Sequence, residues 1–143
     1  DIPGQELFQF YTDDGMRRSI ESGQINQYIK EITGNDFTAK DFRTWGGTLE
    51  ALRQFATCLK TQEGCSKAKT EIQVLDSVAK KLGNTRAVCK SSYVYPLLLE
   101  AHKNDALHKW LKRVSILANP TNKLLEKDEK VLLSFLKYSK EQN

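Results

Sequence analysis

TAKDFRTWGGTLEALRQF, residues 38–55, is the stretch that decides the fold expected for this chain. Its apolar residues recur at the spacing of one buried helix face. They are Phe42, Trp45, Leu49, Leu52 and Phe55. Thr38 is a good N-cap, because its hydroxyl can accept a hydrogen bond from an amide of the first turn. The stretch therefore predicts a long helix with one buried face.

Two adjacent glycines, Gly46 and Gly47, lie inside this predicted helix. A glycine in a helix interior costs about 1 kcal/mol relative to alanine. Close approach by another backbone or by a ligand is a plausible reason for keeping it. Arg43 lies one turn earlier, off the apolar face. The helix pattern alone favours a surface arginine paired with Asp36 or Glu50.

The rest of the chain is expected to be helical after one strand. The strand is expected at residues 7–11, followed by the turn signal Thr12-Asp13-Asp14-Gly15. Five further helices are expected. The first begins at Ser22 and is stopped by Gly34, and the second begins at Thr70 and is stopped by Gly83, with Ile72, Leu75, Val78, Ala79 and Leu82 facing inward. The third begins at Pro96, the fourth lies around Leu107, Trp110, Leu111 and Val114, and the last, after a break at Asn119-Pro120, lies around Leu132, Phe135 and Leu136. Residues between Cys58 and Lys69 are expected to form a loop. The fold class is therefore mainly α, a multi-helix domain with a minor β element at its N-terminal end, in a single domain of residues 1–143.

Composition indicates an ordinary soluble globular protein. The 143 residues are 39% hydrophobic and 28% charged, enough for one domain with a real core. No apolar run approaches the roughly 18 residues that span a bilayer, and no signal peptide is visible. Three cysteines, an odd count, favour a reducing, cytoplasmic setting over a disulfide framework. The two histidines and three cysteines lack the spacing of a zinc site, so no metal is expected.

The net charge of +4 is unevenly distributed. Residues 1–36 carry seven acids and three bases, residues 37–113 carry fourteen bases and seven acids, and residues 114–143 carry five bases and four acids. An anionic partner is therefore expected at the middle of the chain. Lysine-rich helix faces are also common without any such partner, so the charge favours nucleic acid without establishing it.

Residues 82–96, LGNTRAVCKSSYVYP, hold a second concentration of polar side chains. Tyr93 lies near the helix boundary that Pro96 predicts. A tyrosine in such a place usually packs its ring and hydrogen-bonds its hydroxyl, and a phenol with a pKa near 10 is a poor nucleophile without help. Arginine suits a phosphoryl oxygen because its planar fork donates two hydrogen bonds. Arg43 with Tyr93 in a basic domain thus weakly indicates phosphodiester chemistry, with a structural tyrosine as the alternative.

Two motifs carry a resemblance to a known family. TAKDFRTWGGT (residues 38–48) with LGNTRAVCKSSYVYP closely resembles the catalytic domain of poxvirus/bacterial-type DNA topoisomerase IB. PGQELFQFYTDDG and INQYIKEITGNDF resemble the same enzymes, so the likeness covers residues 2–100. The wider superfamily, tyrosine recombinases included, has an arginine three residues after a histidine or lysine. Further on it has a His, Trp or Asn nine residues before the nucleophilic tyrosine. Lys40 and Arg43 match the first motif, and Asn84 and Tyr93 match the second.

The resemblance implies a mechanism that needs neither ATP nor a metal. Tyr93 attacks a DNA phosphodiester, which gives a 3′-phosphotyrosyl enzyme and a free 5′-hydroxyl. Arg43 holds a non-bridging oxygen as negative charge builds in the transition state. Asn84 stands where many relatives have histidine, so its amide can donate a neutral hydrogen bond but supplies no cation. The cut strand rotates, releases supercoils and is resealed.

The resemblance also implies DNA contacts. Lys40 and Lys90 fit phosphate contacts, with ordinary solvated lysines as the alternative. Arg86 stands where bacterial members have proline, and either adds a DNA contact or loosens the turn. Such contacts fix the position of the enzyme on the duplex and carry little sequence information. The expected partner is double-stranded DNA, bound by a monomer in the cytoplasm (nucleoid-associated in a bacterium) and without a cofactor.

Part of the family's catalytic set is missing from this sequence. Another arginine and a lysine, the general acid, lie on segments that precede a PGQELFQ-like stretch in the family. The sequence starts at Asp1 rather than methionine, so we expect a C-terminal fragment of the catalytic domain. Loss of general-acid help costs on the order of 10²- to 10⁴-fold. The isolated chain is therefore expected to be inactive or severely impaired.

Two other functions are compatible with the same motifs. A tyrosine recombinase or integrase uses them to exchange strands, and a non-enzymatic helical module would bind DNA while merely retaining them. The lysine at position 40 and the DFRTWGGT context favour the topoisomerase. The missing upstream residues keep the binding module open for this polypeptide.

Overall fold

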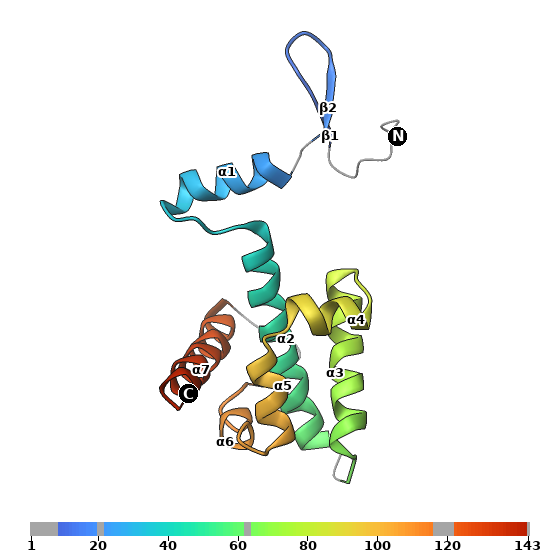
Figure 1. The fold of residues 1–143 in the computed structure, drawn as a ribbon, viewed down its shortest axis with the longest axis vertical. Helices are drawn as coiled ribbons and strands as arrows, with labels where there is room; N and C mark the ends of the chain where they lie inside the picture. Colours follow the sequence, from blue (N-terminus) through green and yellow to red (C-terminus); the bar gives the residue numbers. More distant parts are fainter. Residues whose placement is uncertain (1–8, 20–21, 62–63, 116–121, 143) are drawn as a thin grey trace. The chain divides into compact units, whose positions relative to one another are not determined.

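The computed structural model describes residues 9–19, 22–61, 64–115 and 122–142 (Figure 1). The chain divides into two compact units, residues 1–42 and 43–143, which are described separately below. Within the described ranges, no helix combines the length and the apolar character needed to cross a membrane.

A β-hairpin opens the first unit. Strands β1 (Gln9–Tyr11) and β2 (Arg17–Ser19) pair antiparallel, with Phe10 opposite Arg18. Gly15 takes a φ of 77° in the connecting turn, a left-handed conformation that glycine adopts at little cost. The predicted strand and turn are confirmed for the described residues, while Leu7 and Phe8 lie outside them. The second strand was missed because its charged sequence lacks the alternation that marks a strand.

The first unit continues with helix α1, Ser22–Thr33. Gly34 follows it with a φ of 69°, which confirms the predicted stop. The apolar residues Ile25, Tyr28, Ile29 and Ile32 of α1 recur at the spacing of one helix face, but Tyr28 and Ile32 are each 63% exposed. Ile25 and Ile29, on the same face, are half-buried.

Helix α2, Ala39–Thr61, begins in the first unit and runs into the second. Thr38 caps it as predicted, because the Asp41 amide donates to the Thr38 hydroxyl and the Thr38 amide donates to the Asp41 carboxylate. The predicted stripe is buried at Leu49, Leu52 and Phe55. Phe42 is a correction, since it is 54% exposed at the start of the helix.

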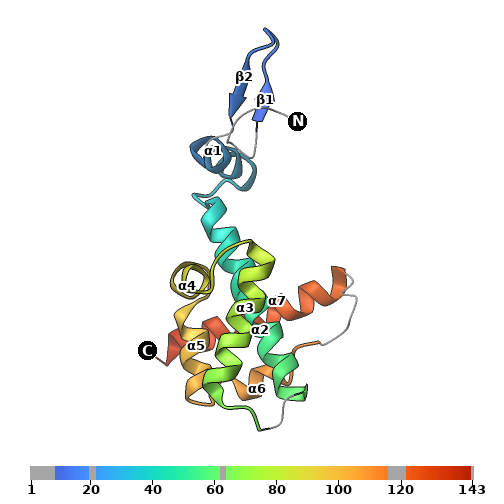
Figure 2. The same cartoon turned by 90° about the vertical axis from the view of Figure 1, so that its right-hand side faces the viewer.

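Helix α3, Lys67–Leu82, lies beside α2 in the second unit (Figure 2). Glu50 and Lys81 join the two helices at 2.6 Å. Both helices extend further into the predicted loop than the sequence indicated. Ser66 caps α3 by accepting a hydrogen bond from the Lys69 amide. Ile72 is a second correction: it is 44% exposed, whereas its neighbours on the predicted stripe pack inward.

Three further helices close the core of the second unit: α5 (Pro96–Lys103), α6 (His108–Leu111) and α7 (Asn122–Glu141). The predicted break at Asn119-Pro120 lies outside the described residues. The core joins side chains from α2, α3, α5, α6, α7 and the segments that connect them. The largest fully buried ones are Phe55, Phe135, Leu52, Leu75, Leu98, Leu107 and Leu132. The mainly α fold class with a minor β element is confirmed.

A buried ion pair joins α7 to α2. The Asp128 carboxylate is 2% exposed and accepts hydrogen bonds from Arg53 Nε at 2.9 Å and from the Ser115 amide at 3.0 Å. About two turns closer to the start of α2, the Trp45 indole donates to Glu129 at 3.1 Å. Since a buried carboxylate is costly unless it is paired, these bonds fix where α7 packs.

Candidate active site

The tyrosine segment, residues 83–95, connects α3 to α5 (Figure 1). Gly83 ends α3 with a φ of 67°, as the sequence predicted. Thr85 then caps the short helix α4, Arg86–Val88, by accepting a hydrogen bond at 3.2 Å from the amide of the last residue of that helix. Pro96 takes the first position of α5, where its missing N–H costs nothing. A glycine stop, a threonine cap and a proline at the first helical position therefore define the two ends of the segment.

Tyr93 is the last residue of a π-helical turn, η1, Cys89–Tyr93. The Val94 amide donates to the Cys89 carbonyl at 2.9 Å, the bond pattern of a π turn, which is frequent at functional sites. The Cys89 side chain is fully buried. Burial raises the pKa of its thiol, against an opposing effect of Arg43. Cys89 thus anchors the turn as a protonated thiol and is not a nucleophile.

Arg43 and Tyr93 lie together in the structure, as their pairing in the sequence motifs predicted. The Arg43 guanidinium carbon is 4.9 Å from the centre of the Tyr93 ring, within the range of a cation–π contact. Arg43 Nη2 also donates to the Leu82 carbonyl at 2.7 Å. That carbonyl is at the C-terminus of α3, where carbonyls lack helical partners. The guanidinium is therefore oriented by α3 while it faces the tyrosine. The predicted surface pairing of Arg43 with Asp36 or Glu50 is not what the structure shows.

The adjacent glycines of α2 have different surroundings. A Cβ built on Gly47 would lie 2.4 Å from the Tyr93 carbonyl oxygen, whereas one built on Gly46 would meet nothing within 4 Å. The close backbone approach expected from the sequence is thus present at Gly47 and absent at Gly46. Gly47 lets the backbone that carries Tyr93 contact α2 directly.

Two threonines of α2, which the sequence analysis did not select, hold the same backbone. Thr44 Oγ1 donates to the Ser92 carbonyl at 3.2 Å, and the Tyr95 amide donates to Thr48 Oγ1 at 3.1 Å. Thr48 is fully buried. Small and hydroxyl side chains at helical spacing, off the apolar stripe, are the signal in the sequence that could have indicated this face.

Asn84 lies between the end of α3 and the cap of α4. It is half-buried, and its backbone N–H donates to the Ala79 carbonyl at 3.0 Å. Within the described part of the chain, its side chain makes no hydrogen bond to Arg43 or Tyr93. The structure therefore does not join Asn84 to the other two predicted catalytic residues.

The two cations of the tyrosine segment that were predicted to contact DNA both have acidic partners on α3. Lys90 Nζ donates to Glu71 at 2.7 Å, and Arg86 forms a two-bond pair with Asp76 at 2.6 and 2.9 Å. The hydrogen-bonded carboxylate of Asp76 raises the pKa of Arg86. Both side chains are about half exposed, Arg86 at 50% and Lys90 at 52%. Lys40 is exposed and belongs to the first unit.

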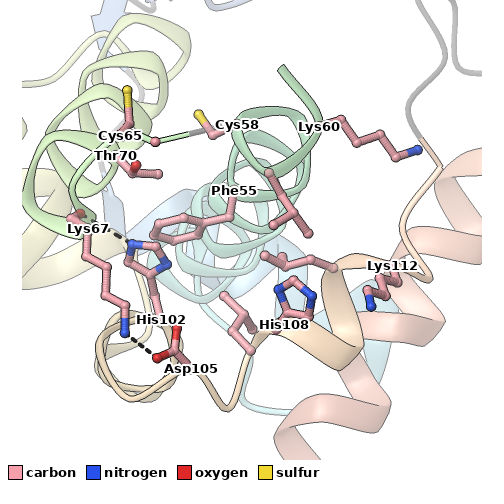
Figure 3. A pocket seen from close by; sticks show the side chains of 14 residues that line it. Phe55, Cys58, Lys60, Cys65, Lys67, Thr70, His102, Asp105, His108 and Lys112 are labelled. Atoms are coloured by element: carbon pink, nitrogen blue, oxygen red, sulfur yellow. Dashed lines mark hydrogen bonds and ion pairs between the residues drawn. The ribbon is translucent and has the colours of Figure 1, made fainter. Parts of the chain in front are cut away.

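The opposite end of α2 contains a pocket of about 540 Å³ (Figure 3). Its lining includes Cys58, Cys65, His102 and His108 but neither Arg43 nor Tyr93. Burial, with a smaller effect of Cys65, raises the pKa of the Cys58 thiol, and burial lowers the pKa of His102. Both groups therefore favour their neutral forms at pH 7.

Among the described residues, no group of three or more His, Cys, Asp or Glu side chains could hold a metal ion. This holds for the pocket as well, although two cysteines and two histidines line it. The described residues thus show no metal site at either end of α2.

Comparison with known proteins covers most of this chain. Residues 1–114 match the family described as "Eukaryotic DNA topoisomerase I, catalytic core". The curated DNA topoisomerase 1B of Acanthamoeba polyphaga mimivirus is 33% identical over 113 residues, which cover 73% of this chain and 33% of that protein. The chain thus spans about a third of the length of the curated relative. The chain belongs to the DNA topoisomerase I catalytic-core family and is similar to a type IB topoisomerase catalytic domain, as its sequence motifs indicated.

Proposed function

We propose that this chain is the nucleophile-bearing part of an ATP-independent type IB DNA topoisomerase. The observation that carries the proposal is the guanidinium of Arg43 placed 4.9 Å from the Tyr93 ring. Tyr93 is the sole tyrosine of the tyrosine segment that this arginine contacts among the described residues. Family membership supports DNA as the substrate.

The proposed reaction is a transfer of a phosphoryl group to Tyr93 and back. The phenol oxygen forms a bond to the DNA phosphorus, and the bond from phosphorus to the 5′-oxygen breaks. The phenol loses one proton and the 5′-oxygen gains one, so the step is balanced. Arg43 donates hydrogen bonds to a non-bridging oxygen, where charge develops in the transition state. Strand rotation and the reverse attack by the 5′-hydroxyl complete the cycle.

The cation that assists Tyr93 is supplied by Arg43 rather than by residue 84. An asparagine amide is neutral and donates from its NH₂ group, so it can hold a phosphate oxygen but cannot protonate one. In this proposal Asn84 contributes one hydrogen bond to the phosphate. The proton for the leaving oxygen comes from a lysine outside this chain, as the resemblance implies.

The remaining predictions about the parent enzyme are part of the same proposal. Lys90 and Arg86 exchange Glu71 and Asp76 for DNA phosphates when the duplex binds, and Lys40 adds a further contact. The parent acts as a monomer in the cytoplasm. The 143-residue chain alone cleaves DNA poorly or not at all, because it contributes one half of the catalytic set.

A plasmid assay tests the proposed function. The complete parent enzyme, expressed from the open reading frame that encodes this chain, should relax supercoils without ATP or magnesium. Tyr93→Phe should abolish relaxation, whereas Tyr138→Phe, which removes an exposed phenol of α7, should not. Relaxation by Tyr93→Phe at the wild-type rate would show that the nucleophile is another residue. Strand exchange at paired specific sites would instead identify a recombinase.

A further inference from the structure

We propose that Thr44, Gly47 and Thr48 form a clamp on α2 that positions Tyr93 for attack. The clamp joins α2 to the tyrosine segment on both sides of the nucleophile. This inference rests on the proposed function, because it assigns a role to residues that contact the backbone around Tyr93. They are positioning residues, distinct from Arg43 and Tyr93.

The clamp bonds the backbone immediately before and shortly after Tyr93. Before it, the Ser92 carbonyl accepts from Thr44 Oγ1 at 3.2 Å. After it, the Tyr95 amide donates to Thr48 Oγ1 at 3.1 Å. The Thr48 hydroxyl proton is directed elsewhere, since Thr48 Oγ1 donates to the Thr44 carbonyl at 2.7 Å. Thr48 Oγ1 is thus held as an acceptor for the amide.

Gly47 supplies the space between these two bonds. Its Cα faces the Tyr93 carbonyl, at a distance where an alanine Cβ would come within 2.4 Å of the oxygen and 3.3 Å of the carbonyl carbon. Backbone atoms on both sides cannot turn away as a flexible side chain can. An added methyl group must therefore push the Tyr93 backbone away from α2.

The π turn explains why such support is needed. The π turn η1 ends in a hydrogen bond between residues i and i+5, and it is followed by extended backbone at Val94, with φ −121° and ψ 126°. The chain therefore leaves the helical run directly after Tyr93, and the regular helical bonds no longer restrain it. The clamp replaces them with bonds to α2, the helix that also carries Arg43. One rigid element thus sets the position of both catalytic groups.

Such positioning affects the chemical step rather than DNA binding. A misplacement of about 1 Å can cost on the order of 10² in rate. Thr48→Val keeps the side-chain volume but removes the acceptor of the Tyr95 amide. Gly47→Ala moves the Tyr93 backbone. Both changes should therefore lower the cleavage rate while the affinity for DNA stays the same.

The test measures single-turnover cleavage of a DNA duplex by the complete parent enzyme, with DNA affinity measured separately. We expect Gly47→Ala and Thr48→Val to slow formation of the covalent complex by on the order of 10- to 100-fold. Thr48→Ser, which restores the hydroxyl, should recover most of the rate. The matched controls are Gly46→Ala, where the added methyl meets nothing within 4 Å, and Thr57→Val, which loses the bond from Thr57 Oγ1 to the Arg53 carbonyl on the same helix. Both controls should cleave at the wild-type rate.

The outcomes separate the clamp from the proposed function. Wild-type cleavage rates for both Gly47→Ala and Thr48→Val would overturn the clamp and leave Tyr93 as the nucleophile. A slow Thr48→Ser would overturn the role of the hydroxyl. A covalent complex formed by Tyr93→Phe would overturn the proposed function itself. If the buried variants do not fold, Thr44→Val at a half-buried position decides: slow cleavage supports the clamp, and a wild-type rate contradicts it.

Discussion

The two ends of α2 in the second unit both gather side chains capable of chemistry, but they organise them differently. Near its start, Arg43 faces Tyr93, and the backbone on each side of the tyrosine is bonded to the helix. Near its end, Cys58 and His102 line a pocket (Figure 3) in which burial favours their neutral forms. Reactive residue types alone thus do not define a site. What distinguishes the Tyr93 end is a guanidinium oriented against the ring of a tyrosine whose backbone is bonded to α2 on both sides.

The largest effect is expected from a substitution that breaks the Arg43–Tyr93 pair. Arg43→Ala should lower the single-turnover cleavage rate of the parent enzyme by on the order of 10²- to 10³-fold, because a donor to the developing charge is lost. Arg43→Lys keeps the charge but not the planar fork, so it should recover only part of that rate. Cleavage by Arg43→Ala at the wild-type rate would contradict the role of this end of α2.

A second prediction concerns the buried ion pair between Arg53 of α2 and Asp128 of α7. Asp128→Ala leaves Arg53 as a buried, unpaired cation, so the chain should lose about 3 kcal/mol or more of its free energy of unfolding. Urea denaturation of the 143-residue chain measures this loss. The matched control is Asp76→Asn at the exposed pair with Arg86, where little change is expected. An equal effect of the two variants would show that the buried pair does not hold α7.

A smaller effect should follow from Lys90 at the Tyr93 end. If Lys90 exchanges Glu71 for a phosphate, Lys90→Ala should reduce the slope of log affinity for DNA against log salt by about one. Lys103 also lies near Glu71, at 3.6 Å, but outside the tyrosine segment, so Lys103→Ala should leave the slope unchanged. An unchanged slope for Lys90→Ala would mean that Lys90 stays with Glu71.

The smallest effect is expected at the other end of α2. Burial lowers the pKa of His102, against opposing effects of the Lys67 carbonyl and Glu71. His102 therefore binds a proton more readily in the unfolded chain than in the folded chain. The free energy of unfolding should fall as the pH drops below about 6.5, the ordinary pKa of histidine. His102→Gln should flatten this part of the stability profile, measured by thermal unfolding. A profile unchanged by His102→Gln would contradict the assignment.

The sequence predicted the main helices because their caps and stops are local. Thr38, Gly34 and Gly83 act within one helical turn of the boundary they set, so no tertiary contact is needed to recognise them. The errors at Phe42 and Ile72 have a different cause. Periodicity gives the direction in which a side chain points, but whether another element covers it depends on the whole fold.

The candidate site was predictable only in part for the same reason. The motifs selected Arg43 and Tyr93, and the paired glycines indicated a close approach without showing which glycine made it. The π turn of η1 leaves no mark in the sequence, since nothing there specifies an i to i+5 bond. The acidic partners of Lys90 and Arg86 lie on α3, 19 and 10 positions earlier, and required the packed structure to be identified.

The identity of the DNA-linked residue tests the central claim most directly. The parent enzyme can be reacted with a duplex whose cleaved 5′ end diffuses away, which traps the covalent complex. Digestion and mass spectrometry then locate the nucleotide on a peptide of the tyrosine segment. We predict that Tyr93 carries the 3′-phosphate. A phosphate on Tyr95, Ser91 or Ser92 would contradict the account, because the tyrosine that Arg43 contacts is Tyr93.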